Sequence, residues 1–120
     1  MSFDWKEYLN LALVLHGLYP RDFVQEAAFR SSVSRAYYAA FCCARNYARD
    51  NHGFPITRSS REHKDIRNLL RSLGMTQLAR KLDVLRQWRN SCDYEDAVPN
   101  ISHLVGLAIH EARGIIGKLT

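Results

Sequence analysis

The feature that most constrains the fold is a long segment, from Asp22 or Val24 to Asn51, that contains neither glycine nor proline. Apolar residues recur along it at intervals of three and four, the spacing of one face of an α-helix. This apolar stripe consists of Val33, Ala36, Tyr37, Ala40, Ala44, Tyr47 and Ala48, and Phe29 and Phe41 add apolar surface on other sides. We therefore predict a long central helix that neighbouring helices cover on more than one face, with alanines that let a neighbour approach closely.

Four shorter segments show the same helical period: 4–16, 59–73, 76–94 and 101–119. Gly17, Gly53, Gly74 and Pro99 separate the helical segments. Ser59 and Glu62 have the spacing of a capping box, and Thr76 is a candidate N-cap. Because no segment alternates with a period of two, we predict an all-α fold. The expected architecture is an antiparallel bundle of four main helices plus one shorter helix.

The composition limits the class of protein. A chain of 120 residues is long enough for one domain with its own core and too short for two, so we expect a single domain over 1–120. The longest apolar run, Leu11–Leu15, is far shorter than the ~20 residues of a membrane span, and the N-terminus does not resemble a signal peptide. The odd cysteine count, with Cys42 and Cys43 adjacent, does not fit a disulfide framework. We expect a cytoplasmic protein that does not contact membranes.

No motif indicates a cofactor. The chain contains neither a GxxxxGKS loop nor a GxGxxG turn, HExxH pair or Cys/His cluster, so we expect no metal and no dinucleotide. His16 lies beside the apolar face of the first helical segment without a second ligand at helical spacing. It is therefore expected to be a histidine at the edge of the core rather than a metal ligand.

Arg89 occupies a position at which the helical pattern predicts an apolar residue. The stripe of the segment 76–94 consists of Leu78, Leu82, Leu85 and Cys92. At about 100° per residue, Arg89 points almost the same way as Leu82 and Leu85 and should face the interior or a groove. A guanidinium removed from water needs carboxylate, phosphate or carbonyl oxygens around it. Asp93, one turn later, is one such partner and would make the pair a structural brace; the alternative is a binding or catalytic site.

Positive charge is concentrated in the middle of the chain. The formal net charge is +5, which favours an anionic partner but is also common on solvated surfaces. The basic stretch comprises Arg58, Arg61, Lys64, Arg67, Arg71, Arg80, Lys81, Arg86 and Arg89, whereas its acidic residues are Glu62, Asp65 and Asp83. Phosphates of RNA or another nucleic acid would be attracted to this half of the domain, although a solvated face remains an equally good interpretation.

Two segments together resemble the HEPN (higher eukaryotes and prokaryotes nucleotide-binding) family. They are Ser34–Phe41, with the sequence SRAYYAAF, and Leu85–Tyr94, with LRQWRNSCDY; His63 and Lys64 lie between them. The similarity extends from about Phe29 to Leu119 and is greatest to small, stand-alone prokaryotic members. It implies a helical bundle that dimerises. It also implies an RNA-cleaving or RNA- or nucleotide-binding role in toxin–antitoxin or defence systems, in some cases with a nucleotidyltransferase antitoxin as partner.

The resemblance also assigns candidate residues. Active members carry an Arg, a polar residue, three variable residues and a His; Arg89 and Asn90 match the first two, but Tyr94 stands in place of the His. A tyrosine, with an ordinary pKa near 10, is a poor base at neutral pH, whereas a histidine near 6.5 is a good one. Asp93 would compete with a phosphate for the guanidinium. The resemblance thus implies that Arg89 binds phosphate with Asn90 and Tyr94 as polar companions, while catalysis is slow or absent.

Three further residues are candidates. His63 would supply the missing imidazole if the fold brings it near Arg89; the ordinary alternative is an exposed histidine at the start of a helix. Arg35 and Tyr38 belong to the SRAYYAAF segment, and Tyr38 is a candidate for a ligand or subunit contact. Tyr37 follows the apolar stripe and should be a core residue whose hydroxyl reaches a polar partner.

Three functions remain open on this basis. The first is a dimeric HEPN-type module that binds RNA, nucleotide or a partner protein, with Arg89, Asn90, Asp93, Tyr94, Arg35 and Tyr38 as candidate ligand-binding residues. The second is a metal-independent ribonuclease toxin that uses Arg89 with His63 or Tyr94. The third is an interaction protein in which Arg89 and Asp93 form an internal brace.

Overall fold

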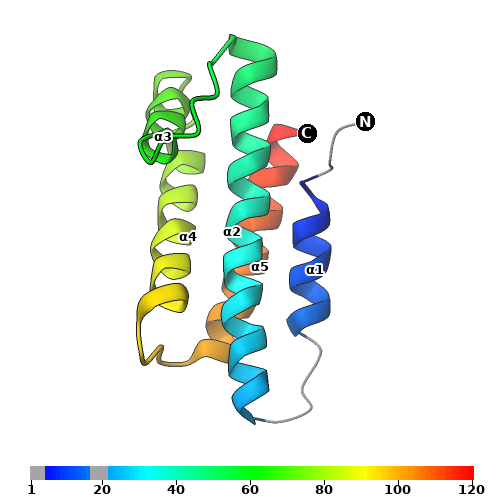
Figure 1. Cartoon of the computed structure of the whole chain (residues 1–120). Coiled ribbons are helices and arrows are strands. Elements are labelled where there is room, and N and C mark those ends of the chain that lie inside the picture. The colour runs from blue at the N-terminus through cyan, green and yellow to red at the C-terminus, as the bar shows by residue number, and fades with distance from the viewer. Residues whose placement is uncertain (1–4, 17–21) are drawn as a thin grey trace.

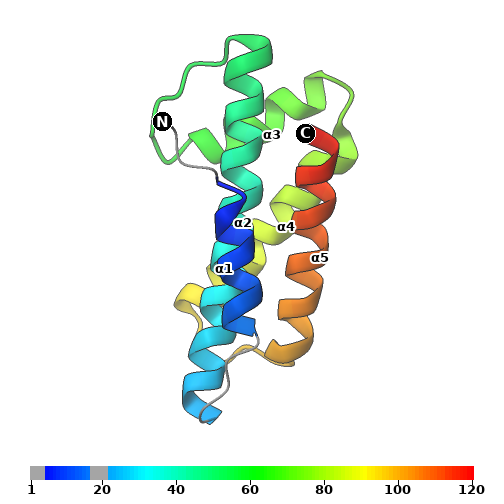
Figure 2. The same cartoon turned by 90° about the vertical axis from the view of Figure 1, so that its right-hand side faces the viewer.

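The computed structural model describes residues 5–16 and 22–120, which form five α-helices. These helices are α1 (Glu7–His16), α2 (Asp22–His52), α3 (Glu62–Ser72), α4 (Thr76–Tyr94) and α5 (Ile101–Leu119). The four helices other than α3 run in alternating directions along the chain, and α3 lies at the end of the bundle where α2 ends (Figures 1 and 2). This arrangement confirms the predicted all-α bundle.

The long helix α2 is the centre of the bundle and contacts each of the other four helices. Its predicted stripe is buried, except that Tyr47 is half-buried. The α5 helix faces it with small and branched side chains, among them Ala108, Ala112 and Ile115, all without exposed surface. Because alanine side chains are short, the two backbones approach closely and bury apolar surface efficiently.

The predicted helix ends agree with the structure where glycines determine them. Gly53 follows α2 with a φ of 63°, and Gly74 follows α3 with a φ of 79°. Both values lie in the left-handed region that glycine adopts without steric cost, so these residues end their helices as C′ residues do. The predicted start of the first helix at Asp4, and its stops at Gly17 and Pro20, lie outside the described residues.

Both predicted N-terminal caps are wrong. The carboxylate of Glu62 does not complete a capping box with Ser59; instead its Oε2 accepts hydrogen bonds from the backbone N–H groups of Thr57 at 2.8 Å and Arg58 at 3.1 Å. The helix α4 starts at Thr76 itself, and no side chain among the described residues caps it. In both cases the conformation of the loop before the helix determines which backbone N–H groups need a hydrogen-bond acceptor. The spacing of residues along the sequence does not predict that conformation.

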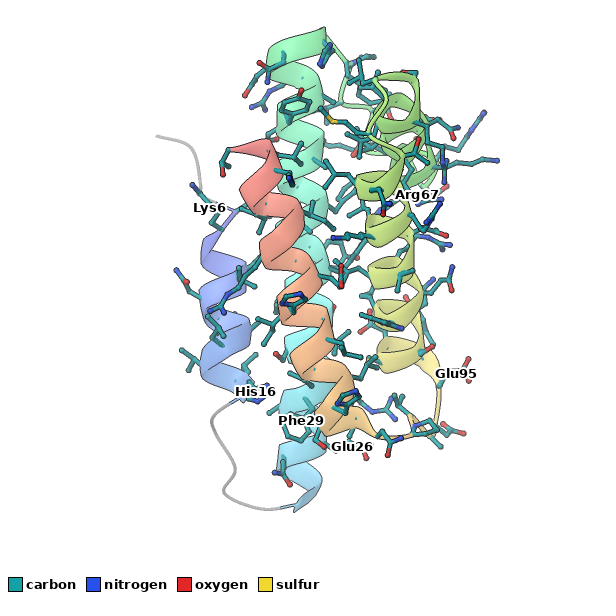
Figure 3. The ribbon with its side chains drawn as sticks, turned by 180° about the vertical axis from the view of Figure 1, so that it is seen from behind. Lys6, His16, Glu26, Phe29, Arg67 and Glu95 are labelled. Carbon is teal, nitrogen blue, oxygen red and sulfur yellow. The ribbon has the colours of Figure 1, made fainter. Side chains whose placement is uncertain are left out.

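Two polar side chains of α2, Ser32 and Arg30, connect this helix to α1 and to the end of α4. Ser32, which is fully buried, donates its hydroxyl to the carbonyl oxygen of Ala12 at 2.8 Å and so joins α1 to α2. Arg30 donates from Nη1 to the carbonyl oxygens of Cys92 at 2.9 Å and Glu95 at 2.6 Å, and from Nη2 to that of Asp96 at 3.1 Å. Figure 3 shows Glu26, the ion-pair partner of Arg30, and Glu95 toward the same end of the bundle. Arg30 therefore satisfies the carbonyl group of Cys92 in the last turn of α4 and those of Glu95 and Asp96 directly after the helix.

We expect Arg30→Met to destabilise the fold by about 1.5–3 kcal/mol, because the substitution keeps the aliphatic stem but leaves carbonyl groups at the end of α4 without a charged donor. The measurement is urea unfolding followed by circular dichroism. Arg49→Met is the matched control, since Arg49 is exposed and pairs only with the adjacent Asp50 within the described part of the chain. Equal unfolding midpoints for the two variants would contradict the role assigned to Arg30.

Candidate functional site

A positively charged pocket lies between α3 and α4. It has a volume of about 370 Å³ and is lined by Ser60, His63, Lys64, Arg67, Arg86 and Arg89. His63 and Arg67 are four residues apart on α3, and Arg86 and Arg89 are three apart on α4, so each pair lies on one helical face. Ile66 and Leu70 anchor α3 in the core, which turns this face toward α4. In Figure 3, Arg67 is labelled where α3 and α4 lie together.

Arg89 is turned inward, as its place in the apolar stripe of α4 predicts. Its side chain is 14% exposed, and its guanidinium carbon lies 5.5 Å from the ring centre of Tyr37 and 5.2 Å from that of Tyr38. Such contacts let the negative faces of aromatic rings stabilise a cation. Nη1 also donates to Asp93 Oδ2 at 3.3 Å, whereas the buried Nε has no hydrogen-bond partner among the described residues. The Arg89–Asp93 brace therefore forms, but it compensates the guanidinium only in part.

Arg67 is the second buried cation of the pocket, with a side chain 11% exposed. Its Nε lies 3.4 Å from Asp83 Oδ1, close enough for an ion pair but not in hydrogen-bonding geometry. Arg86 shares that carboxylate at 3.0 Å. Burial lowers the pKa of Arg67, while the charge of Asp83 opposes that change. Nε and Nη1 of Arg67 are both buried without a hydrogen-bond partner in the described part of the chain.

His63 forms part of the wall of the pocket next to α2. Its ring stacks on Phe41 at 4.1 Å between centres, and its Nδ1 is hydrogen-bonded to the Tyr37 hydroxyl. Burial, together with the charges of Arg89 and Arg67, lowers the pKa of His63 below its usual value. The imidazole is therefore neutral at pH 7. Burial also raises the pKa of Tyr37, so that its hydroxyl keeps the proton.

The structure brings together some of the predicted site residues and separates others. His63 and Arg89 line one pocket, so the interpretation of His63 as an exposed histidine at a helix start is wrong. Tyr38 lies under Arg89, and Tyr37 is the core residue with a polar partner that its position predicts. His16 is half-buried, as predicted, with its ring 5.7 Å from that of Phe29.

The remaining candidates do not line this pocket, although Asp93 bonds to Arg89 at its edge. Asp93 and Arg35 line a separate cavity of about 390 Å³ between α2 and the end of α4. Arg35 also packs over the Tyr8 ring at 5.3 Å. Asn90 is half-buried, and Tyr94 is 77% exposed; neither lines the pocket that holds Arg89. The polypeptide between Arg89 and Tyr94 is helical, so Tyr94 cannot turn back toward the guanidinium without unwinding the end of α4.

Sequence reasoning missed the individual roles of Lys64, Arg67 and Arg86, which it placed in the basic stretch only. For Arg67 a signal was present: it directly follows the buried Ile66 and precedes the buried Leu70 by three residues, so it borders the apolar face of α3. In α4, Arg89 lies in line with the buried Leu82 and Leu85. Two arginines beside apolar faces of neighbouring helices indicate a shared charged pocket.

The site offers charge and hydrogen-bond donors rather than nucleophilic thiols. Burial raises the pKa of Cys42 and that of Cys92 to about 11, so both are thiols at pH 7. Among residues 5–16 and 22–120, no group of three or more His, Cys, Asp or Glu side chains is placed to hold a metal ion. In the same residues, no helix has the length and apolar character needed to cross a bilayer.

Comparison with known proteins assigns neither the chain to a family nor the pocket to a function. No protein-family model matches the chain, and neither a curated protein nor a solved structure matches it significantly.

We expect the free energy of unfolding to decrease as the pH falls from about 7 to 5, with His63 contributing to the decrease. The unfolded chain binds a proton at His63 below about pH 6.5, whereas the folded protein, in which this pKa is lowered, resists protonation. The contribution of His63 to the free energy of unfolding is complete at pH values above the pKa of His63 in the unfolded chain. It is lost as the pH falls from that value through the lower pKa of the folded protein. Urea unfolding across this range checks the expectation. His63→Gln should flatten the dependence, whereas His110→Gln, at an exposed position of α5, should not; identical slopes for His63→Gln and the natural protein would refute the assignment.

Proposed function

We propose that the pocket between α3 and α4 binds phosphate groups of RNA or of a nucleotide. The observation that carries this proposal is the set of three buried guanidinium nitrogens without hydrogen-bond partners in the described residues: Nε and Nη1 of Arg67 and Nε of Arg89. Both arginines line the same pocket. Buried charged donors without acceptors are costly, and an anion that enters the pocket gives them acceptors after small side-chain rotations.

Phosphate is the anion that suits this arrangement best. Four cationic side chains line the pocket, and the neighbouring carboxylates Asp83 and Asp93 are already engaged by Arg67, Arg86 and Arg89. Guanidinium groups bind phosphate through two parallel hydrogen bonds, and Lys64 adds a mobile point charge. A neutral His63 adds a hydrogen-bonding group without adding charge.

The resemblance to HEPN proteins agrees with this location. Tyr37, Tyr38 and Phe41 of the segment Ser34–Phe41 contact Arg89 or His63, so the two motif segments meet at the pocket. On this basis we propose a cytoplasmic HEPN-type binding protein in a toxin–antitoxin or defence system. The same proposal includes a homodimer, and a nucleotidyltransferase antitoxin as the partner protein.

We expect Arg67→Gln and Arg89→Gln each to weaken binding of a fluorescent single-stranded RNA by about 10-fold or more, since each removes a charged donor to phosphate. The dependence of affinity on salt should also decrease, by about 0.7 per lost phosphate contact. Fluorescence anisotropy at several salt concentrations measures both quantities.

Arg71→Gln is the matched control for these variants. Arg71 is also an arginine of α3, but it is exposed, bonds to Asn68 and lies outside the pocket. If Arg71→Gln weakens binding as much as Arg67→Gln, a diffuse basic surface binds the RNA and the pocket assignment is wrong.

A metal-independent ribonuclease is the second candidate, because His63 and Arg89 line one pocket. In this case His63 transfers the proton and Arg89 stabilises the phosphate charge. Cleavage of RNA in the presence of EDTA should then be lost in His63→Gln and Arg89→Gln but kept in Tyr94→Phe, because Tyr94 is exposed outside the pocket. Binding without cleavage by the natural protein would favour the first proposal, and cleavage retained in His63→Gln would contradict the role of His63.

A further inference from the structure

We propose that Tyr37 holds His63 in the tautomer that carries its proton on Nε2, so that His63 offers the pocket an N–H donor for a phosphate oxygen rather than a base for a hydroxyl group. Tyr37 is then a positioning residue that acts through His63. The identity of the ligand in this inference rests on the proposed function, whereas the tautomer does not.

The first argument is the hydrogen-bond inventory of the Tyr37 hydroxyl. Tyr37 has no exposed surface, and the hydrogen bond that the structure gives to its hydroxyl joins it to His63 Nδ1. A phenol carries one donor, and a neutral imidazole carries one donor nitrogen and one acceptor nitrogen. If Nδ1 carried the proton, the buried O–H would have no acceptor in the described part of the protein, which is costly. With the proton on Nε2, the O–H donates to Nδ1 and both groups are satisfied.

The second argument is electrostatic. The groups that face His63 are Tyr37 and Phe41 from α2, Glu62 and Arg67 from α3, and Arg86 and Arg89 from α4. Glu62, the acidic member of this set, accepts hydrogen bonds from Thr57 and Arg58 of the preceding loop. The three arginines disfavour an imidazolium, so the His63 ring carries a single proton, on one of its two nitrogens.

The third argument is the rigidity of the ring. His63 stacks on Phe41 at 4.1 Å and on Tyr37 at 5.7 Å, with angles between the ring planes of 14° and 16°. The stacked rings restrict rotation of the imidazole, and the bond at Nδ1 leaves Nε2 as the nitrogen available to the pocket. An N–H donor that is oriented before binding loses little conformational entropy when an anion arrives.

This arrangement has a consequence for chemistry at the site. A nitrogen that already carries a proton cannot remove one from a ribose 2′-hydroxyl, although it can donate a hydrogen bond to a phosphate oxygen. His63 thus lines the same pocket as Arg89, as a catalytic base would. Its protonated Nε2, however, suits it to bind a phosphate oxygen rather than to remove a proton. The tautomer explains how a pocket with an arginine and a histidine can bind phosphate without fast cleavage.

The test is a ¹⁵N–¹H correlation spectrum of histidine side chains in the ligand-free protein at about pH 7.5, with the His63 signals assigned by their loss in His63→Gln. We expect a protonated Nε2 and an unprotonated Nδ1 for His63. Tyr37→Phe should remove this preference and produce a mixture of tautomers, whereas Tyr38→Phe, at the adjacent position on α2, should leave it unchanged. An unprotonated Nε2 in the natural protein would overturn the inference, and this measurement decides even if Tyr37→Phe does not fold.

A titration with inorganic phosphate separates this inference from the proposed function. The His63 Nε2–H signal should shift on phosphate binding, and Tyr37→Phe should weaken the affinity by roughly two- to tenfold, the effect of one hydrogen bond. If the tautomer is as expected but phosphate causes no shift, phosphate binding is wrong and the positioning role of Tyr37 stands. If phosphate binds and Tyr37→Phe changes neither tautomer nor affinity, the positioning role is wrong and phosphate binding stands.

Discussion

The close packing of α2 against its four neighbours is the constraint on which the rest of the structure depends. Its buried alanines, Ala36, Ala40 and Ala44 among them, allow helices to approach from several sides. The larger side chains of the same helix then have defined positions. Phe41 stacks on His63 of α3, and Tyr37 contacts the guanidinium of Arg89 of α4. The charged pocket therefore rests on a rigid aromatic surface that belongs to the core, and this surface limits the movement of both Arg89 and His63.

The pocket shows how a small bundle stabilises several cations close together. Asp83 is shared by Arg67 and Arg86, Asp93 pairs with Arg89, and the aromatic rings of α2 contact the Arg89 guanidinium. Although burial favours the neutral acid, the hydrogen bond from Arg86 and the charge of Arg67 lower the pKa of Asp83. These partners compensate the positive charge without using every donor. Nε and Nη1 of Arg67 and Nε of Arg89 keep no hydrogen-bond partner among the described residues. These unpaired donors allow the pocket to accept an anion, which a fully hydrogen-bonded network of charges would not do.

The resemblance to the HEPN pattern that we infer from the sequence does not include position 94, where that pattern has a histidine and this chain has a tyrosine. Tyr94 is exposed at the end of α4, whereas His63 from α3 lies on the same pocket as Arg89. A histidine on a different helix is held by different neighbours, here the Tyr37 hydroxyl and the Phe41 ring. Its protonation state follows from these neighbours rather than from its residue type, which is why we infer a binding role where an imidazole alone suggests catalysis.

The sequence by itself determined the helices, the buried stripes of α2 and α4, the glycines that end α2 and α3, and the inward direction of Arg89. These properties follow from the helical period and from local backbone preferences, which depend on residues a few positions apart. Only the tertiary structure decided that His63 lies on the pocket of Arg89, that Glu62 bonds to Thr57 and Arg58 instead of capping with Ser59, and that Arg30 caps α4. Each of these contacts depends on how loops and separate helices pack in space, and a periodic pattern within one helix contains no information about that packing.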